Sequence, residues 1–187
     1  TNGVDSGRMV HHLKKTNLPQ SWQTTRPLNI AQSVPNRKNT LGVFLGITFG
    51  QTSATALRGL VNDSKVRAIR LTPWRSILLE GTEYIEPRHF TFCQANELRA
   101  VYACPGAPAC SNASIETREL AAKLAKITTK PLHISGCSKG CALPKSASVT
   151  ITGYNASYDL TINGCAWDKP IKKGMSMSEL FEYIERL

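Results

Sequence analysis

The chain has 187 residues, of which 41% are hydrophobic and 19% are charged, and this length allows one large domain or two small ones. No apolar run is long enough to span a membrane, and the N-terminus lacks the basic-then-apolar pattern of a signal peptide. The formal net charge is +10, but no lysine block or aromatic interleaving accompanies it, which argues against nucleic acid and membrane partners. Because Thr1 opens a polar stretch without a methionine, we expect a fragment or a processed product.

Residues 1–39 are predicted to form a flexible basic tail or linker. They carry six basic residues against one acid, and prolines recur at eight-residue intervals among Asn, Gln, Ser and Thr. No helical or strand periodicity is sustained in this stretch, so we expect it to be solvated.

A small α+β unit is expected over residues 40–96. The hydrophobic pattern predicts a strand at 41–49, a helix from 53 to 62, and strands at 66–72 and 75–80. The buried stripe of this helix is predicted to be Ala56, Leu57, Leu60 and Val61. A connector with a short helix at 87–95 should follow. This order of strand, helix and two strands is typical of half of a ferredoxin-like fold.

A second, α/β unit is expected over residues 97–187. Strands are predicted at 98–103, 132–134, 149–152 and 158–162, and helices at 115–127 and 177–187. Ser114 is the expected cap of the first helix, and Ser176 with Glu179 forms the capping-box pattern of the second. The overall fold class is therefore α+β.

Four cysteines lie in two loops rich in Gly, Pro and Ser, each after a predicted short strand. Cys104 and Cys110 have the spacing C-x5-C, and Cys137 and Cys141 the spacing C-x3-C. Structural zinc sites use tighter knuckles, whereas a 4Fe–4S cluster takes four separate thiolates, so the spacing favours a cluster over zinc or unligated thiols. Gly106, Gly136 and Gly140 would let backbone N–H groups approach the sulfurs.

The remaining two cysteines, Cys93 and Cys165, have no spacing partner and are interpreted as ordinary thiols. Six cysteines without an export signal predict a reducing, cytoplasmic location, where clustered cysteines are metal ligands or catalytic groups rather than disulfides.

The two cysteine loops resemble the cluster signature of the sirohaem-containing nitrite and sulfite reductase family. The resemblance implies that Cys104, Cys110, Cys137 and Cys141 hold a 4Fe–4S cluster, with Cys141 at the position that bridges to the sirohaem iron. Most of these reductases have Pro-Asn after the third cysteine, whereas this chain has Ser138-Lys139. That variant, with the segment at 69–75, is similar to the precorrin-3B synthase branch of the family.

The resemblance to this branch implies an O2-dependent oxidoreductase of cobalamin biosynthesis. Its members are described as hydroxylating precorrin-3A and closing a lactone to give precorrin-3B, with a 4Fe–4S cluster, a mononuclear non-haem iron and an electron donor. No two-His-one-carboxylate set for such an iron is evident in the sequence. The family is pseudo-duplicated, so this chain is expected to be a C-terminal half whose N-terminal half is missing.

Two other functions are considered. One is a sirohaem-dependent sulfite or nitrite reductase fragment, and the other is a non-catalytic iron–sulfur electron-transfer module.

A tetrapyrrole with many carboxylates needs fixed cations in its pocket, preferably arginines. The expected tetrapyrrole-binding residues are Arg70, Thr72, Arg75, Lys139 and His133. The resemblance places the Arg-x-Thr segment at the macrocycle. Each of the charged residues has an alternative interpretation as a surface charge, and His133 as a satisfied core histidine.

Overall fold

The computed structural model describes residues 13–24, 38–63, 66–83, 90–92 and 100–187. The chain divides into two compact units, Thr1–Val34 and Pro35–Leu187. In the first unit the described residues form one exposed 3-10 turn, η1 (Gln20–Trp22). The division at residue 34 lies close to the predicted tail boundary at residue 39, and the predicted boundary near residue 96 falls outside the described residues.

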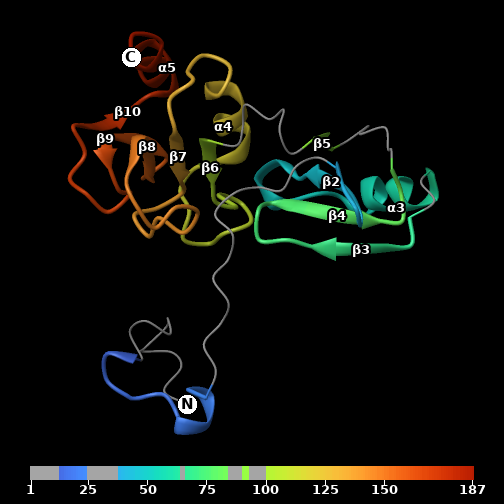
Figure 1. Ribbon diagram of the computed structural model, residues 1–187. Coiled ribbons are helices and arrows are strands. Elements are labelled where there is room, and N and C mark those ends of the chain that lie inside the picture. The colour runs from blue at the N-terminus through green and yellow to red at the C-terminus, as the bar shows by residue number, and fades with distance from the viewer. Residues whose placement is uncertain (1–12, 25–37, 64–65, 84–89, 93–99) are drawn as a thin grey trace. The chain divides into compact units, whose positions relative to one another are not determined.

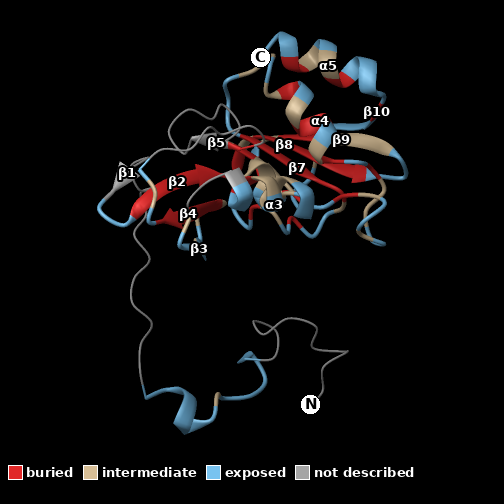
Figure 2. Ribbon diagram, turned by 90° about the vertical axis from the view of Figure 1, so that its right-hand side faces the viewer, coloured by how far each residue is buried: buried red, intermediate tan, exposed pale blue. Residues whose placement is uncertain are grey.

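The first sheet of the second unit is antiparallel. Its strands are β1 (Lys38–Asn39), β2 (Gly42–Gly46), β3 (Ala68–Leu71), β4 (Ser76–Glu80) and β5 (Thr91–Phe92). They pair in the order β1-β2-β4-β3, and β5 also pairs with β2. Helix α3 (Ala54–Asp63) supplies Leu60 to the core that alternate residues of β2 and β4 form. Both strands are buried along their whole length (Figure 2).

The second sheet is mixed and has the order β10-β9-β8-β7-β6 (Figure 1). Its strands are β6 (Val101–Ala103), β7 (Leu132–Ser135), β8 (Ala147–Tyr154), β9 (Ser157–Gly164) and β10 (Lys172–Met175). The pairs β6–β7 and β7–β8 are parallel, and the other two pairs are antiparallel. Helices α4 (Arg118–Leu124) and α5 (Met177–Glu185) contribute Leu120, Leu124, Leu180 and Ile184 to the core of this sheet. None of the described helices is long and apolar enough to cross a bilayer.

Several predicted element boundaries are wrong in the first sheet. The strand predicted to reach residue 49 ends at Gly46, because Thr48–Gly50 forms the 3-10 turn η2 with Phe49 at a φ of 52°. Lys38–Asn39 pairs with β2 instead of belonging to the tail. Val61 is 44% exposed and not part of the buried helix stripe. Thr91–Phe92 forms a strand within the predicted helix at 87–95, whose other residues, apart from Phe90, lie outside the described ranges.

The helix caps of the second sheet correct one prediction and confirm another. Helix α4 begins at Arg118 rather than at residue 115, and the Glu116 carboxylate accepts the amides of Arg118, Glu119 and Leu120. The Ser114 hydroxyl, the predicted cap, is buried and has no hydrogen-bond partner among the described residues. The capping box of α5 is confirmed, since Ser176 Oγ accepts the Glu179 amide and Glu179 Oε2 accepts the Ser176 amide.

Candidate metal centre

The two cysteine loops leave the same edge of the second sheet. Cys104 directly follows β6, and Cys137 lies two residues beyond the end of β7. These strands are parallel, with Ala103 opposite Ile134, so their carboxyl ends carry both loops to one place. This edge is the usual location of sites in sheets with parallel strands. We call residues 104–110 the first cysteine loop and residues 137–141 the second cysteine loop.

Gly136, the residue just before the second cysteine loop, contacts the first cysteine loop directly. Its backbone N–H donates a hydrogen bond to Cys104 Sγ at 3.2 Å, and its carbonyl accepts the Ser114 amide at 3.0 Å. A Cβ at Gly136 would lie 2.5 Å from Ala113 Cβ. Only glycine therefore permits this approach, and the approach brings an amide donor to a candidate ligand sulfur.

The first cysteine loop is closed by its own backbone. The Cys110 amide donates to Gly106 O at 2.8 Å, and Thr117 Oγ1 donates to Cys104 O at 2.5 Å. Gly106 has a φ of +67°, and a Cβ there would lie 2.6 Å from Thr117 Oγ1. The loop conformation thus depends on a glycine and on a hydroxyl at the start of α4.

The second cysteine loop is held at both ends. Ser135 Oγ donates to Cys137 O at 2.7 Å, and the Leu143 amide donates to Gly140 O at 3.3 Å. Gly140 adopts a φ of +62°. Trp167 packs on this glycine: a Cβ at Gly140 would lie 2.8 Å from Trp167 Cζ3. The sequence did not predict this contact.

The four loop cysteines differ in exposure. Cys104 is buried, Cys110 and Cys137 are half-buried, and Cys141 is exposed; among the described residues, none of the four forms a disulfide. Within the described ranges, no three His, Cys, Asp or Glu side chains lie close enough to hold one metal ion. Each iron of a 4Fe–4S cluster takes one thiolate ligand from the protein. Four thiols, with an amide donor on one of them, fit the cluster.

Arg70 and Arg67 share one buried carboxylate. Arg70 Nε pairs with Glu80 Oε1, and Arg67 Nη2 lies 3.4 Å from Glu80 Oε2. The Arg70 hydrogen bond is the main reason why the pKa of Glu80 is below its usual value. The two guanidinium side chains are 68% and 75% exposed, and one carboxylate balances only one of their two charges.

Thr72 and Arg75 both make internal hydrogen bonds. Thr72 Oγ1 donates to Ser76 O at 2.7 Å. Arg75 Nη1 donates to Val101 O on β6 at 2.7 Å, and its guanidinium lies 5.1 Å from the centre of the Tyr102 ring. Arg75 therefore connects the first sheet to the strand that leads into Cys104.

His133 and Lys139 have opposite environments. His133 on β7 is fully buried, and neither ring nitrogen has a hydrogen-bond partner in the described structure. Its burial lowers the pKa to about 4, so the imidazole is neutral at physiological pH. Lys139 is exposed on the second cysteine loop.

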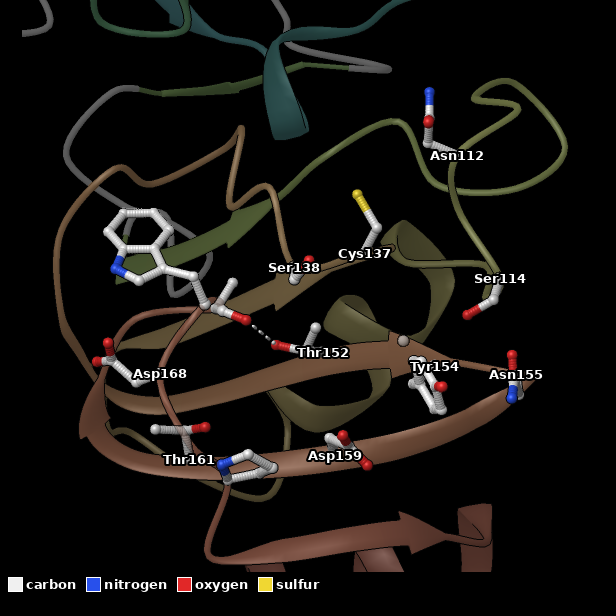
Figure 3. Close-up of a pocket in the computed structure, with 14 residues that line it drawn as sticks. Asn112, Ser114, Cys137, Ser138, Thr152, Tyr154, Asn155, Asp159, Thr161 and Asp168 are labelled. Carbon is white, nitrogen blue, oxygen red and sulfur yellow. Dashed lines mark hydrogen bonds between the residues drawn. The ribbon is translucent and has the colours of Figure 1, made fainter.

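An open pocket of about 340 Å³ lies beside the second cysteine loop. It lies between Cys137 and Ser138 on one side and Asp159 and Thr161 of β9 on the other (Figure 3). Its described lining contains two carboxylates, Asp159 and Asp168, and neither lysine nor arginine. A polycarboxylate macrocycle would be repelled there, so this pocket does not suit a tetrapyrrole.

The comparisons agree with this fold and with the predicted resemblance. The fold is similar to that of the NirA protein of Mycobacterium tuberculosis, with a TM-score of 0.56 at 18% identity over 86% of this chain and 39% of the NirA chain. In sequence, the chain is similar to a precorrin-3B synthase from Sinorhizobium sp, with 30% identity over 140 residues.

The second similarity covers 65% of this chain and 30% of that synthase, so the chain spans less than half the length of either relative. No family model matches the chain. The suspected resemblance to precorrin-3B synthase is confirmed in sequence, and the mixed α+β fold is consistent with the nitrite and sulfite reductase fold.

Proposed function

We propose that this chain is the cluster-binding part of an oxidoreductase like precorrin-3B synthase, which hydroxylates precorrin-3A with O2 and closes a lactone to give precorrin-3B. The observation that carries the proposal is the meeting of the two cysteine loops at one sheet edge, where Gly136 donates to Cys104 Sγ. The similarity to precorrin-3B synthase supplies the reaction class.

In this proposal Cys104, Cys110, Cys137 and Cys141 hold a 4Fe–4S cluster, which supplies one-electron chemistry when bound. The protein contributes a fixed amide donor at Cys104 and glycines that keep the backbone close to the sulfurs. Hydrogen bonds to thiolate sulfur stabilise the negative charge of a cluster and so influence its potential. Cys141, the exposed ligand, is the proposed contact toward the macrocycle.

The substrate is proposed to bind through the first sheet, which we interpret as a ferredoxin-like half-domain. Arg70 keeps most of its surface exposed while Glu80 holds its guanidinium, so it is oriented for a carboxylate. Thr72, Arg75 and Lys139 complete the proposed set, whereas the expected ligand contact of His133 is not retained, because this side chain is fully buried and neutral. Among the described residues these two arginines, Arg67 and Arg70, share one carboxylate, Glu80, and this excess of positive charge favours an anionic ligand.

The proposed partners are the tetrapyrrole, O2, an electron donor and an N-terminal half that completes the pocket. A cytoplasmic location is part of the proposal, because free thiols are kept reduced there. The described residues contain no grouped ligands for a mononuclear iron, so none of them is assigned to it.

A sirohaem-dependent reductase is the second candidate, favoured by the similarity in fold to NirA. A non-catalytic electron-transfer module is the third, and it would bind no tetrapyrrole. In each case the same four cysteines would hold the cluster.

A titration of the cluster-loaded chain with precorrin-3A and, separately, with sirohaem distinguishes the three candidate functions. We expect saturable binding of precorrin-3A. This binding should weaken in Arg70→Gln, because a carboxylate of the substrate would lose the guanidinium group of Arg70. Arg186→Gln is the matched control, since this exposed arginine pairs with Glu182 on α5. Preference for sirohaem, with its strong visible bands, would favour the reductase, and binding of neither would favour the electron-transfer module.

A further inference from the structure

The second cysteine loop is the more exposed of the two, yet its central glycine is covered by an aromatic ring. A Cβ at Gly140 would lie 2.8 Å from Trp167 Cζ3 and 3.1 Å from Trp167 Cε3. The six-membered ring of the indole therefore rests on the loop backbone between Cys137 and Cys141. The Trp167 side chain remains 52% exposed, so one part covers the loop and the rest meets solvent.

The turn that carries Trp167 is fixed by several hydrogen bonds. Asp168 Oδ2 accepts the Cys165 amide at 2.7 Å, and the Asp168 amide donates to Cys165 O at 3.2 Å. A carboxylate bound to an amide three residues earlier and a closing backbone bond together define a tight turn. The backbone at Trp167 is thus fixed by contacts within its own turn.

Threonines of β8 tie this turn to the sheet that also carries the cysteines. Thr150 Oγ1 donates to Gly164 O at 2.7 Å. Thr152, labelled in Figure 3, donates from Oγ1 to Ala166 O at 3.3 Å. Both threonines are buried. Since β8 pairs with β7, the turn and the second cysteine loop share one rigid base.

We propose that Trp167 is a positioning residue that clamps the second cysteine loop and limits the access of solvent to the half-buried Cys137. A glycine at φ +62° gives the loop backbone freedom that a neighbouring side chain must restrict. The indole restricts it by covering Gly140. The role at a bound cluster rests on the proposed function, but the clamp itself acts on the metal-free chain.

The clamp is tested by the alkylation rate of each cysteine in the metal-free chain, resolved by peptide mass mapping. In Trp167→Ala, the half-buried Cys137 should react about threefold faster or more, because local opening of the loop raises thiol access, and the exposed Cys141 should change less. Cys104 and Cys110 should keep their rates. Trp167→Phe should stay near wild type, because a smaller ring still covers Gly140.

Trp22→Ala is the matched control, since Trp22 is also an exposed indole but lies in the other compact unit. It should leave all rates unchanged. An unaltered rate at Cys137 in Trp167→Ala would overturn the proposal. So would equal acceleration of all four cysteines in both Trp167 variants, because that result would indicate general unfolding.

A second measurement addresses the cluster. Reconstitution of iron and sulfide should quench tryptophan fluorescence in wild type, and Trp167→Phe should remove most of that quenching. The reconstituted Trp167→Ala chain should lose its cluster in air faster than wild type. If wild type took up no cluster, the proposed function would fail while the alkylation result still decided the clamp.

Discussion

The backbone amide of Gly136 donates to Cys104 Sγ at 3.2 Å, so the strand end that delivers the second cysteine loop contacts the first cysteine of the other loop. The two residues are 32 positions apart in sequence. Parallel pairing of β6 with β7 places them together, and the missing side chain at 136 permits the short distance. Gly136 therefore connects the end of β7 to one of the four loop cysteines.

Gly136→Ala should damage both stability and cluster retention. Its Cβ would fall 2.5 Å from Ala113 Cβ, and relieving this overlap should lower the free energy of unfolding by about 1–3 kcal/mol. The shift would also move the amide away from Cys104 Sγ. Gly59→Ala on α3 is the control, because nothing lies within 4 Å of its Cβ and the change should stabilise by about 0.5–1 kcal/mol. Urea melts and iron content measure the two effects, and an unaffected Gly136→Ala would contradict the steric account.

Arg75→Gln should loosen the strand that leads into Cys104. It removes a charged donor from Val101 O and the guanidinium over Tyr102, which together should cost about 2 kcal/mol of unfolding free energy. Hydrogen exchange of the β6 amides should quicken more than that of β9. Arg186→Gln should change stability by less than about 0.5 kcal/mol, since its ion pair is exposed. Equal effects of the two substitutions would rule out a special role for Arg75.

His133 should make the chain less stable in mild acid. Burial lowers its pKa from 6.5 to about 4, so between these values the unfolded chain binds a proton that the folded chain does not. The free energy of unfolding should therefore fall as the pH drops through this window, by up to about 1.4 kcal/mol per pH unit from this residue. Urea melts at pH 7 and pH 5 should show a smaller pH effect in His133→Gln than in wild type. The same effect in both chains would refute the assignment to His133.

Much of the fold could be predicted from local sequence. The run of β-branched residues in β8 and the Ser176–Glu179 capping box indicated their elements correctly. Strand β10 was missed because Lys172-Lys173-Gly174-Met175 has no apolar alternation, and only pairing with β9 makes it a strand. The cap of α4 was misassigned because the Glu116 carboxylate, and not the Ser114 hydroxyl, reaches the first amides.

The candidate site was predictable where it depends on spacing and not where it depends on tertiary contact. The two cysteine pairs and the strands before them were evident from the sequence, as was the need for glycine at 106, 136 and 140. The partners of the arginines were not. Glu80 reaches Arg70 only across the β3–β4 pair, and Arg75 reaches Val101 across 26 positions. The contact of Trp167 with Gly140 had no sequence signal, because it depends on how the turn before β10 folds back.

Iron and sulfide analysis after anaerobic reconstitution tests the central claim most directly. We predict about four irons and four sulfides per chain in wild type, with a clear loss in Cys141→Ser. Cys165→Ser is the matched control, because this thiol lies outside both loops and burial with the nearby Asp168 carboxylate raises its pKa, which disfavours the thiolate that binds metal. It should keep the full content. One zinc per chain without sulfide, or an equal loss in both variants, would contradict the assignment of the cluster to these two loops.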